Sequence, residues 1–367
     1  MKLHLSAVVF LLVCSVFGIA SNNQSQEGKD LIEKAAEKMS IFALPYFEMK
    51  GNVRIDNQGK PLEGTYLLLW NGPDQWREEI NFPGYTEIQL GGKGVVFLKR
   101  NVDFMPLRIN QLRTALGYGT AGNSVSMMSL TPRSDETIKR VKDRKVNGTK
   151  VKCAEIADQD KHTREVCVDA STGTLVREGA FLDKDMMPVG PKLFPRFLSY
   201  VQGGKPLAEV QVTELKTTEQ FPSAAFVPPA GSLSRPGCMN PSPFRLVHKV
   251  SPQYPEEERR SHVEGTVAVY TWIGVDGKPR DFRIVSGVTP GLNAASIDGV
   301  QQWRYDPATC NGTPVEVETV LTVNYACGNP FRQRMSTCSL LSPSTPRTCI
   351  FPRFCKIASA SRNSDCG

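Results

Sequence analysis

The residue types that most often carry out chemistry are sparse in this sequence and form no known constellation. Three histidines, His162, His248 and His262, lie in the body of the chain, and none stands at metal-ligand spacing from another histidine or a cysteine. The G-x-S-x-G motif of serine hydrolases is absent. Residues 117–122, GYGTAG, fit the glycine pattern of dinucleotide-binding loops, but a segment with helical rhythm precedes them instead of a buried strand. The sequence therefore predicts a loop there, no metal, no cofactor and no enzyme.

Two of the ten cysteines stand where a disulfide is expected. Cys153 and Cys167 flank two candidate strands around the polar turn in AEIADQDKHTREV, so we predict a disulfide across this hairpin. The alternative, a reactive thiol, needs an activating neighbour that the sequence does not reveal. Cys238 and Cys310 form a second candidate pair, which would tie a linker to the C-terminal domain.

The N-terminus predicts export, and an oxidising compartment permits disulfides. Lys2 precedes an apolar run over 5–17, and small residues end at Ala20. We therefore assign residues 1–20 as a signal peptide that is cut after Ala20. Two alternatives stay open. Cys14 could be lipidated, although no small residue precedes it, or the segment could remain as an inner-membrane anchor, although its apolar run is shorter than a membrane span.

The net charge of +7 is not spread evenly along the chain. Residues 328–367 hold six basic residues against Asp365 alone, so this tail contributes +5. Nucleic-acid binding needs a basic face on a folded domain, and we therefore predict no nucleic-acid partner. The four cysteines of the tail lack zinc-ribbon spacing. We expect the tail to be disordered or a reading-frame artefact, with a small disulfide knot as the alternative.

The elements that must position any site follow from hydrophobic periodicity. A helix with one apolar face is predicted over 28–39. Alternating apolar runs separated by turn residues extend over residues 48–101, and again from about residue 140 to 216. A helical stretch with a glycine break lies between them, over 105–130. This order predicts an α+β fold whose first domain, residues 21–220, is a curved antiparallel sheet or half-barrel with a helix.

A second, smaller domain follows a linker. The linker spans 221–243, which is rich in proline, serine and glycine and has little periodicity. Beyond it, two strands joined by an Asp-Gly turn precede a helix that opens with Thr-Pro. A final strand covers 314–325. The order predicts a small β-β-α-β domain over 244–327.

Short motifs in this second domain fall in sequence order at fixed spacing. Tyr254-Pro255 precedes the first strand, and glycine, Asp-Gly, Trp-Arg-x-x-Pro and Asn-Gly motifs follow. Together they resemble the TonB C-terminal domain family. The resemblance implies structural roles for the following residues: Gly265, Asp276, Gly277, Trp303, Arg304, Pro307, Asn311 and Gly312.

The resemblance also implies a periplasmic interaction module. In that family the domain adds an extended peptide of an outer-membrane transporter to an exposed sheet edge. The final strand is last in order, so we expect it at an edge with unpaired backbone groups. The implied partner-binding residues are Gln253, Tyr254, Pro255, Val315, Val317, Thr319, Leu321, Val323 and Tyr325. The alternative is that the tail, or a second copy of the chain in a homodimer, covers this edge.

The first domain resembles the half-barrel of LolA-type outer-membrane lipoprotein carriers. The resemblance rests on the segments WNGPDQWREEINFPGYTEIQLGGKGVVFLKRN and KVKCAEIADQDKHTREVCVDASTGTLVREG. It implies an apolar concavity that holds acyl chains. Tyr66, Trp70, Trp76 and Phe97 would line that concavity, or else they fill an ordinary core, which is the interpretation we adopt.

We therefore expect an exported, periplasmic, non-enzymatic protein. Its TonB-like domain would bind a peptide of an outer-membrane transporter or another envelope protein, as in TonB-dependent transport. The chain departs from the family's pattern because it has no long proline-rich spacer, which puts energy transduction in doubt. The alternatives are a carrier of lipid or lipoprotein acyl chains that works through the first domain, and a structural envelope protein that dimerises through its sheet edge.

Overall fold

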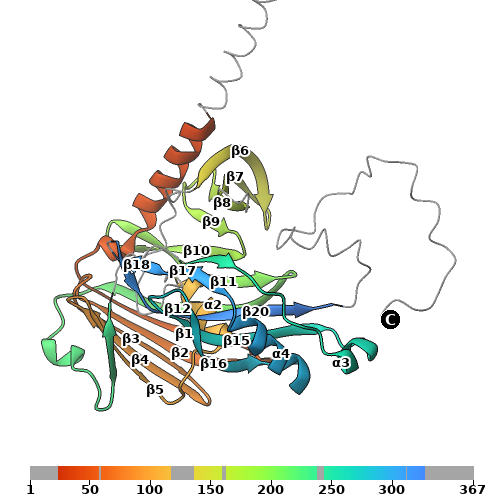
Figure 1. Cartoon of the computed structure of the whole chain (residues 1–367). Helices are drawn as coiled ribbons and strands as arrows, with labels where there is room; N and C mark the ends of the chain where they lie inside the picture. The colour runs from red at the N-terminus through yellow and green to blue at the C-terminus, as the bar shows by residue number, and fades with distance from the viewer. Residues whose placement is uncertain are drawn as a thin grey trace, which may run out of the picture.

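The computed structural model consists of a large curved sheet and a smaller domain beside it (Figure 1). It describes residues 24–57, 59–116, 136–158, 163–237, 244–310 and 312–326. No helix within these ranges is long and apolar enough to span a membrane. The predictions for the signal peptide, the GYGTAG loop, Cys238 and the C-terminal tail lie outside the described residues.

Thirteen strands form one continuous antiparallel sheet. Its first half is a meander of β1 (Phe47–Asn57), β2 (Lys60–Trp70), β3 (Trp76–Phe82), β4 (Tyr85–Gly92) and β5 (Val95–Arg100). Its second half is a meander of β6 (Thr137–Val146), β7 (Thr149–Ala157), β8 (Thr163–Asp169), β9 (Leu175–Glu178), β10 (Phe181–Val189), β11 (Lys192–Gln202) and β12 (Lys205–Thr217). Because β1 also pairs with β12, the two meanders join in the middle of the sheet. The predicted curved antiparallel sheet is confirmed.

Close approaches and bulges shape this sheet. At Gly91 on β4, an added Cβ would lie 2.2 Å from the ring of Trp76, so a larger residue would push the indole away from its neighbouring strand. The β1–β12 ladder shifts register between Lys50 and Gly51. A register shift of this kind bends a strand and increases its twist, which helps the sheet to curve.

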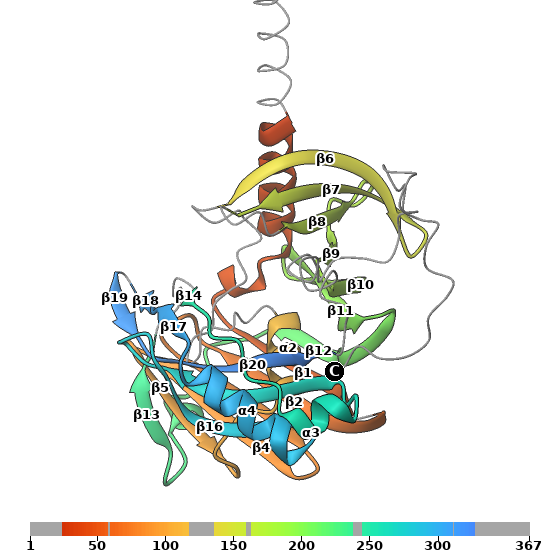
Figure 2. The same ribbon diagram turned by 45° about the vertical axis from the view of Figure 1, so that its right-hand side comes forward.

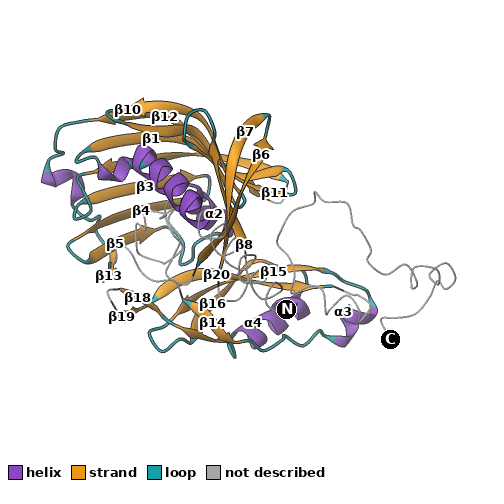
Figure 3. Ribbon diagram, turned by 90° about the horizontal axis from the view of Figure 1, so that it is seen from above, coloured by secondary structure: helices purple, strands orange, loops and turns teal. Residues whose placement is uncertain are grey.

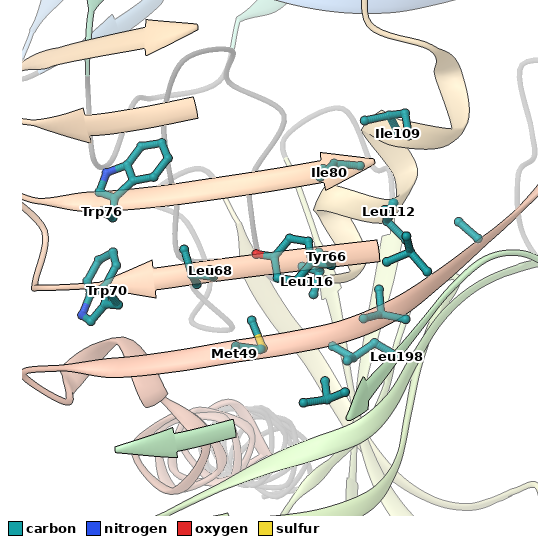
Figure 4. Close-up of a cluster of buried hydrophobic side chains, with 14 of the residues drawn as sticks. Met49, Tyr66, Leu68, Trp70, Trp76, Ile80, Ile109, Leu112, Leu116 and Leu198 are labelled. Atoms are coloured by element: carbon teal, nitrogen blue, oxygen red, sulfur yellow. The ribbon is translucent and has the colours of Figure 1, made fainter. Parts of the chain in front are cut away.

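The helix α2 (Leu107–Ala115) lies on the concave side of the large sheet, where it contacts β1, β11 and β12. Its Ile109 and Leu112 are fully buried in the largest apolar core of the protein. In Figure 4 they point toward the strands that carry Tyr66 and Ile80. The sequence predicted a helical stretch here, and its helical part fills the concavity of the half-barrel.

Three of the four aromatic residues assigned to a concavity or a core belong to this core. Tyr66, Trp70 and Trp76 are each at most 2% exposed. The Trp70 indole N–H also donates to the carbonyl oxygen of Leu44 at 3.1 Å. Phe97, on β5, is half-buried. The core interpretation is thus confirmed for the first three.

A second, smaller core holds the N-terminal helix, residues 24–39, against β6–β9 (Figure 2). Ile32 on this helix is fully buried beside Ile138 and Ile156. The predicted helix over 28–39 is confirmed and extends back to residue 24.

The same end of the sheet contains a disulfide. Cys153 on β7 and Cys167 on β8 face each other in register and are bonded, as predicted. Cys310 is also disulfide-bonded, and the cysteine predicted to pair with it, Cys238, lies outside the described residues.

The predicted linker runs along the half-barrel and contains two short elements, η2 (Ser223–Phe226) and β13 (Leu233–Pro236). Phe221 exchanges two hydrogen bonds with the Asn71 side chain, at 2.9 and 3.1 Å. Beyond η2, β13 pairs antiparallel with β5 and forms the end strand of the thirteen. The segment therefore completes the edge of the first domain before the chain enters the second.

The second domain is built on a three-stranded sheet. Its main elements are β15 (Gly265–Ile273), β16 (Pro279–Ser286), α4 (Pro290–Val300) and β20 (Val317–Tyr325). Short elements complete it: β14 (Arg245–His248), α3 (Glu256–Arg260), β17 (Arg304–Asp306), β18 (Ala308–Cys310) and β19 (Thr313–Val315). The helix α4 begins as predicted, because the Thr289 side chain accepts a hydrogen bond from the backbone N–H of Leu292 at 3.2 Å. The predicted β-β-α-β order is confirmed.

The prediction of a single strand over 314–325 is wrong in one respect. It is two strands, because β19 pairs back on β18 while β20 pairs with β15. Glu316 separates them. Val315 therefore belongs to a small hairpin and not to the strand at the sheet's end.

Candidate functional site

The strand β20 lies at one end of the three-stranded sheet, whose order is β16-β15-β20. Nine register pairs join it to β15, from Gly265–Tyr325 to Ile273–Val317. Among the described residues, no strand pairs with its other side. The expectation that the final strand is an edge strand is met for the described residues, and an edge strand is one to which a partner strand can be added.

The odd-numbered side chains of β20 point into the core of their own domain. Val317, Val323 and Tyr325 are buried there, and Leu321 packs against the same core. Thr319 is buried as well. A peptide added at this edge would therefore meet the backbone of these residues, and their side chains would hold the strand in place from behind.

Residues 253–255, which directly precede α3, meet β20 at its C-terminal end. The ring of Tyr254 lies edge-on to that of Tyr325, with 5.2 Å between centroids, and its hydroxyl donates to the carbonyl oxygen of Val263. Pro255 precedes the first turn of α3, and Gln253 is exposed. The structure thus brings the two predicted contact segments together at one corner of the module.

The Asp-Gly turn between β15 and β16 fits only glycine at its second position. Gly277 has a φ of +71°, and an added Cβ would lie 1.9 Å from the carbonyl oxygen of Tyr305. The Gly277 carbonyl accepts from the Tyr305 N–H at 2.9 Å. Asp276 closes the turn by accepting from the Lys278 N–H at 3.1 Å. The turn therefore locks the hairpin onto β17.

The remaining motif residues also lie in the framework of the module. The Trp303 indole donates to the carbonyl oxygen of Val250 at 2.7 Å, and Arg304 donates to two nearby carbonyl groups. A Cβ at Gly265 would lie 2.7 Å from Val288. Pro307 separates β17 from β18, and Gly312, with a φ of +83°, forms the turn before β19. Asn311 lies outside the described residues.

The other face of the module sheet packs on the half-barrel. Tyr270 and Trp272 of β15 belong to the same apolar core as the half-barrel interior, and Val320 of β20 packs against it. The ring of Tyr270 lies 6.4 Å from that of Phe104, which precedes α2. In the view from above, α2 lies between the curved sheet and β20 (Figure 3). The two domains therefore share a core.

A group of buried charges crosses this shared core, and we call it the interdomain cluster. Its members are Glu78 of β3, Glu87 of β4, Arg100 of β5, Arg113 of α2 and Glu318 of β20. The carboxylates are at most 3% exposed, and the guanidinium groups are 5% and 12% exposed.

The geometry of the cluster is a chain of ion pairs. Arg100 donates two parallel hydrogen bonds of 2.7 Å to the two carboxylate oxygens of Glu318 and also contacts Glu87. Arg113 bonds to Glu87 and to Glu78, the latter at 2.6 Å. The Tyr270 hydroxyl donates to Glu318 at 2.8 Å. Such a two-pronged, desolvated arginine–carboxylate pair is among the strongest side-chain contacts in proteins.

Burial by itself would raise the pKa of each carboxyl in the cluster. At Glu318 the charge and hydrogen bonds of Arg100 outweigh burial and hold the pKa at about 2. The pKa of Glu87 also lies below its ordinary value despite burial, because Arg100 and Arg113 flank it. The pKa of Glu78 is raised, because its burial outweighs the attraction of Arg113. Glu78 is thus the least compensated carboxyl of the three.

Weaker contacts surround the cluster. Arg283 of β16 pairs with Asp103 at 2.8 Å, and both side chains are more than half exposed. The guanidinium of Arg235, from β13, lies 3.6 Å above the ring centroid of Trp272. The linker therefore also contacts the module.

A cavity of about 260 Å³ opens between the two domains. Its apolar wall comes from the ends of β1–β3, from the segment before α2 and from β16: Ile55, Leu62, Phe82, Val102, Phe104 and Val285. Among the described residues, no group of three or more His, Cys, Asp or Glu is arranged to hold a metal ion. The two features that could bind a ligand are therefore the apolar cavity and the edge strand β20.

The sequence interpretation missed the interdomain cluster. One signal was available in WREEINF, where Glu78 shares the inward phase of Trp76 and Ile80. Glu87 likewise shares the inward phase of Tyr85 on β4. A carboxylate on the buried face of a strand calls for a cationic partner. Nothing in the sequence indicated that the partners would come from α2 and β5, or that β20 would join them.

Comparisons with known proteins show what the module is similar to. Residues 250–327 match the family model of the Gram-negative bacterial TonB protein C-terminal. The resemblance inferred from the motifs is confirmed over this range. Protein TonB from Vibrio cholerae is 28% identical over 100 residues, which is 27% of this chain. The match spans 41% of that relative's length.

Solved structures that resemble the chain cover its N-terminal part. An outer membrane lipoprotein-sorting protein domain from Vibrio parahaemolyticus is 12% identical, with 55% of this chain and 97% of that chain covered and a TM-score of 0.37. A LolA superfamily protein from Nitrosomonas europaea is 11% identical, with 56% and 97% covered and a TM-score of 0.36. We take no ligand or mechanism from these distant likenesses.

Proposed function

We propose that this protein is an exported, non-enzymatic component of the cell envelope whose TonB-like module binds an extended peptide by strand addition at β20. The partner is a peptide segment of an outer-membrane transporter or another envelope protein. The observation that carries the proposal is the position of β20 at the end of the module sheet, with no strand beside it among the described residues. The family match over 250–327 supports it.

Strand addition suits this edge because the side chains of β20 already pack within the protein, so a peptide would bind to the backbone of the strand. The odd-numbered residues of β20 hold the module core, and Glu318 holds the half-barrel. The strand is therefore ordered before any peptide arrives, which lowers the entropy lost on binding. Affinity would come from main-chain hydrogen bonds, and Gln253 and Tyr254 at the end of the strand would contribute to selectivity.

Hydrogen exchange on the mature full-length chain tests this proposal. Short overlapping peptides from the N-terminal segments of outer-membrane transporters of the same organism would be titrated and the exchange followed by mass spectrometry. We expect protection along 317–325 and around 253–255, and no change in β6 at the far end of the large sheet. Protection elsewhere, or none with any peptide, would contradict the proposal.

A matched ligand control separates strand addition from ordinary side-chain contact. The best peptide would be made again with alternate backbone amides methylated, which removes its donors but keeps its side chains. Strand addition requires that binding be lost. Light scattering in the same experiment reports whether a second copy of the chain occupies the edge, since a homodimer would dissociate as peptide is added.

A second function is favoured by the cavity between the domains. Its wall is largely apolar, and its volume of about 260 Å³ matches part of an acyl chain rather than a whole lipid. In this alternative the protein carries lipid or lipoprotein acyl chains through the half-barrel, and α2 must move to admit more of the chain.

Native mass spectrometry of the mature protein tests the carrier alternative. A co-purified mass in the lipid range, lost in a Leu62→Trp variant that fills the cavity, would support it. The matched control is Leu233→Trp on the exposed β13, which leaves the cavity open. A protein without bound lipid that also fails to take up palmitate would count against it.

A further inference from the structure

The helix α2 touches both the interior of the half-barrel and the module. Its apolar face, with Ile109 and Leu112, fills the concavity, and the helix also contacts β20. Its Arg113, whose side chain is 12% exposed, reaches Glu78 and Glu87 on the sheet. A displacement of α2 would therefore remove a cation from the interdomain cluster.

The loss of Arg113 would affect β20 through the other members of the interdomain cluster. Glu87 is shared, because Arg113 and Arg100 bind its two different oxygens. Arg100 is shared in turn between Glu87 and Glu318. With Arg113 in place, three carboxylates face two guanidinium groups, and without it they face one. Arg100 would then be the one guanidinium group of the cluster left to compensate Glu87 and Glu318. Burying a carboxylate that lacks a cationic partner is strongly unfavourable.

We propose that α2 and β20 are energetically linked, so that the position of α2 in the half-barrel sets how firmly β20 is held. Arg113 is the positioning residue of this link, and it acts through Glu87 and Arg100. The consequence that anything entering the concavity changes peptide affinity at β20 rests on the proposed function. The link itself does not, since it concerns only contacts within the chain.

The physical requirement for such a link is a contiguous set of contacts that has two arrangements. The contiguous set here runs from α2 to β4, β5 and β20 through three arginine–carboxylate contacts. The structure shows one arrangement, in which Glu318 pairs with Arg100 while α2 lies in the half-barrel, and the proposed link requires a second, in which Glu318 is released when α2 moves away. By reciprocity, whatever loosens β20 must also loosen α2.

Hydrogen exchange of two neighbouring α2 variants tests the link without any ligand. Arg113→Gln removes the charge, and Leu112→Ala removes a buried side chain one residue away without touching the cluster. Both loosen α2. The link predicts that the amides of 317–321 exchange on the order of tenfold faster in Arg113→Gln than in Leu112→Ala. Equal exchange of this segment in the two variants would overturn it.

A second variant keeps the test decisive if Arg113→Gln does not fold. Glu78→Gln removes the carboxyl that is least compensated, whose Oε1 accepts no hydrogen bond from the described residues. Arg113 then pairs with Glu87 alone. The link therefore predicts that the backbone amides of 317–321 exchange more slowly than in the natural protein. Unchanged or faster exchange there would overturn the link.

Peptide titration of the same variants keeps the two proposals apart. If the natural protein binds a peptide at β20, Arg113→Gln should weaken that binding more than Leu112→Ala does. If no peptide binds while the exchange difference is present, the proposed function fails and the link stands. If a peptide binds equally to both variants and their exchange is equal, the function stands and the link fails.

Discussion

Two arginines on the large sheet are held by pairs of glutamates, but in different settings. Arg164 on β8 pairs with Glu136 and Glu178 of the same half of the sheet, and its side chain is 21% exposed. Arg100 on β5 pairs with one glutamate of its own sheet and with Glu318 of the module, and it is 5% exposed. The first pair of contacts ties β8 to its neighbour β9 and to the residue before β6, and the second joins two domains.

The difference shows how one chemistry serves two purposes. Around Arg164, solvent reaches the edge of the cluster, and one cation meets two anions of the same domain. Around Arg100, the charges are desolvated and connected through Glu87 to a helix and through Glu318 to an edge strand. Loss of the first should loosen one end of the half-barrel, whereas loss of the second should separate the module from it.

The largest effect is expected from Arg100→Leu. It leaves Glu87 and Glu318 buried with less compensation, and breaking a buried pair in this way costs about 3–5 kcal/mol. Urea denaturation should show this loss in the free energy of unfolding, with the module becoming more sensitive to proteolysis. The matched change Arg164→Leu should cost less, because that site is partly solvated. An equal or larger effect at Arg164 would break the comparison.

Removal of the disulfide should act at the opposite end of the sheet. The double change Cys153→Ala and Cys167→Ala opens a loop with a sequence separation of 14, which should cost about 3 kcal/mol. Hydrogen exchange should rise in β6–β9 and the helix over 24–39, which pack together. Exchange in β20 should stay unchanged, and a rise there would show that the two ends of the sheet are not independent.

The pH dependence of stability should identify Glu318. Its pKa is about 2 in the folded protein against an ordinary 4.5, so the folded state binds its proton less readily than the unfolded state. Its contribution to stability is therefore complete above the ordinary pKa and is lost as the pH falls toward 2. Between about pH 5 and pH 3 the natural protein should lose about 2 kcal/mol more than Glu318→Gln does.

Glu78 acts with the opposite sign in the same titration. Its pKa is raised in the folded protein, so its protonation favours folding as the pH falls. The comparison with Glu318→Gln removes this contribution, because Glu78 is present in both proteins. If the free energies of unfolding of the natural protein and Glu318→Gln fall by the same amount between about pH 5 and pH 3, the assignment of Glu318 is wrong.

The smallest effect is expected from Arg283→Ala. The Arg283–Asp103 pair joins the same two domains as the interdomain cluster, but both side chains are exposed. Exposed pairs of this kind contribute about 0–1 kcal/mol and weaken with salt. Urea denaturation at low and high salt measures it. A loss comparable to that of Arg100→Leu would mean that the rim, and not the buried cluster, holds the domains together.

Much of the fold followed from local patterns. Alternation of apolar and polar residues predicted the strands of both domains, and the Asp-Gly turn and the Thr-Pro cap placed the hairpin and helix of the module. The pairing of Cys153 with Cys167 also followed from two short strands around a turn. These features depend on neighbours in sequence, and neighbours in sequence are what a single chain displays.

The break between β19 and β20 could not be predicted in this way. The alternation from Val315 to Tyr325 is continuous in sequence, yet the chain changes partner at Glu316. The partner of a strand is decided by contacts distant in sequence, and the residues of β20 pair with residues of β15 that lie 44 to 60 positions earlier in the chain.

The amino-acid sequence by itself determined the curved sheet, the small β-β-α-β module with its family motifs, and the aromatic core. Each arises from periodicity, turn chemistry or spacing along a short stretch of chain. Only the tertiary structure decided that α2 fills the half-barrel, that the module sheet packs against the same core, and that five charges from five elements meet there. The physical reason is that a buried charge requires a partner, but any sufficiently close element can supply one, and only the packed chain determines which element that is.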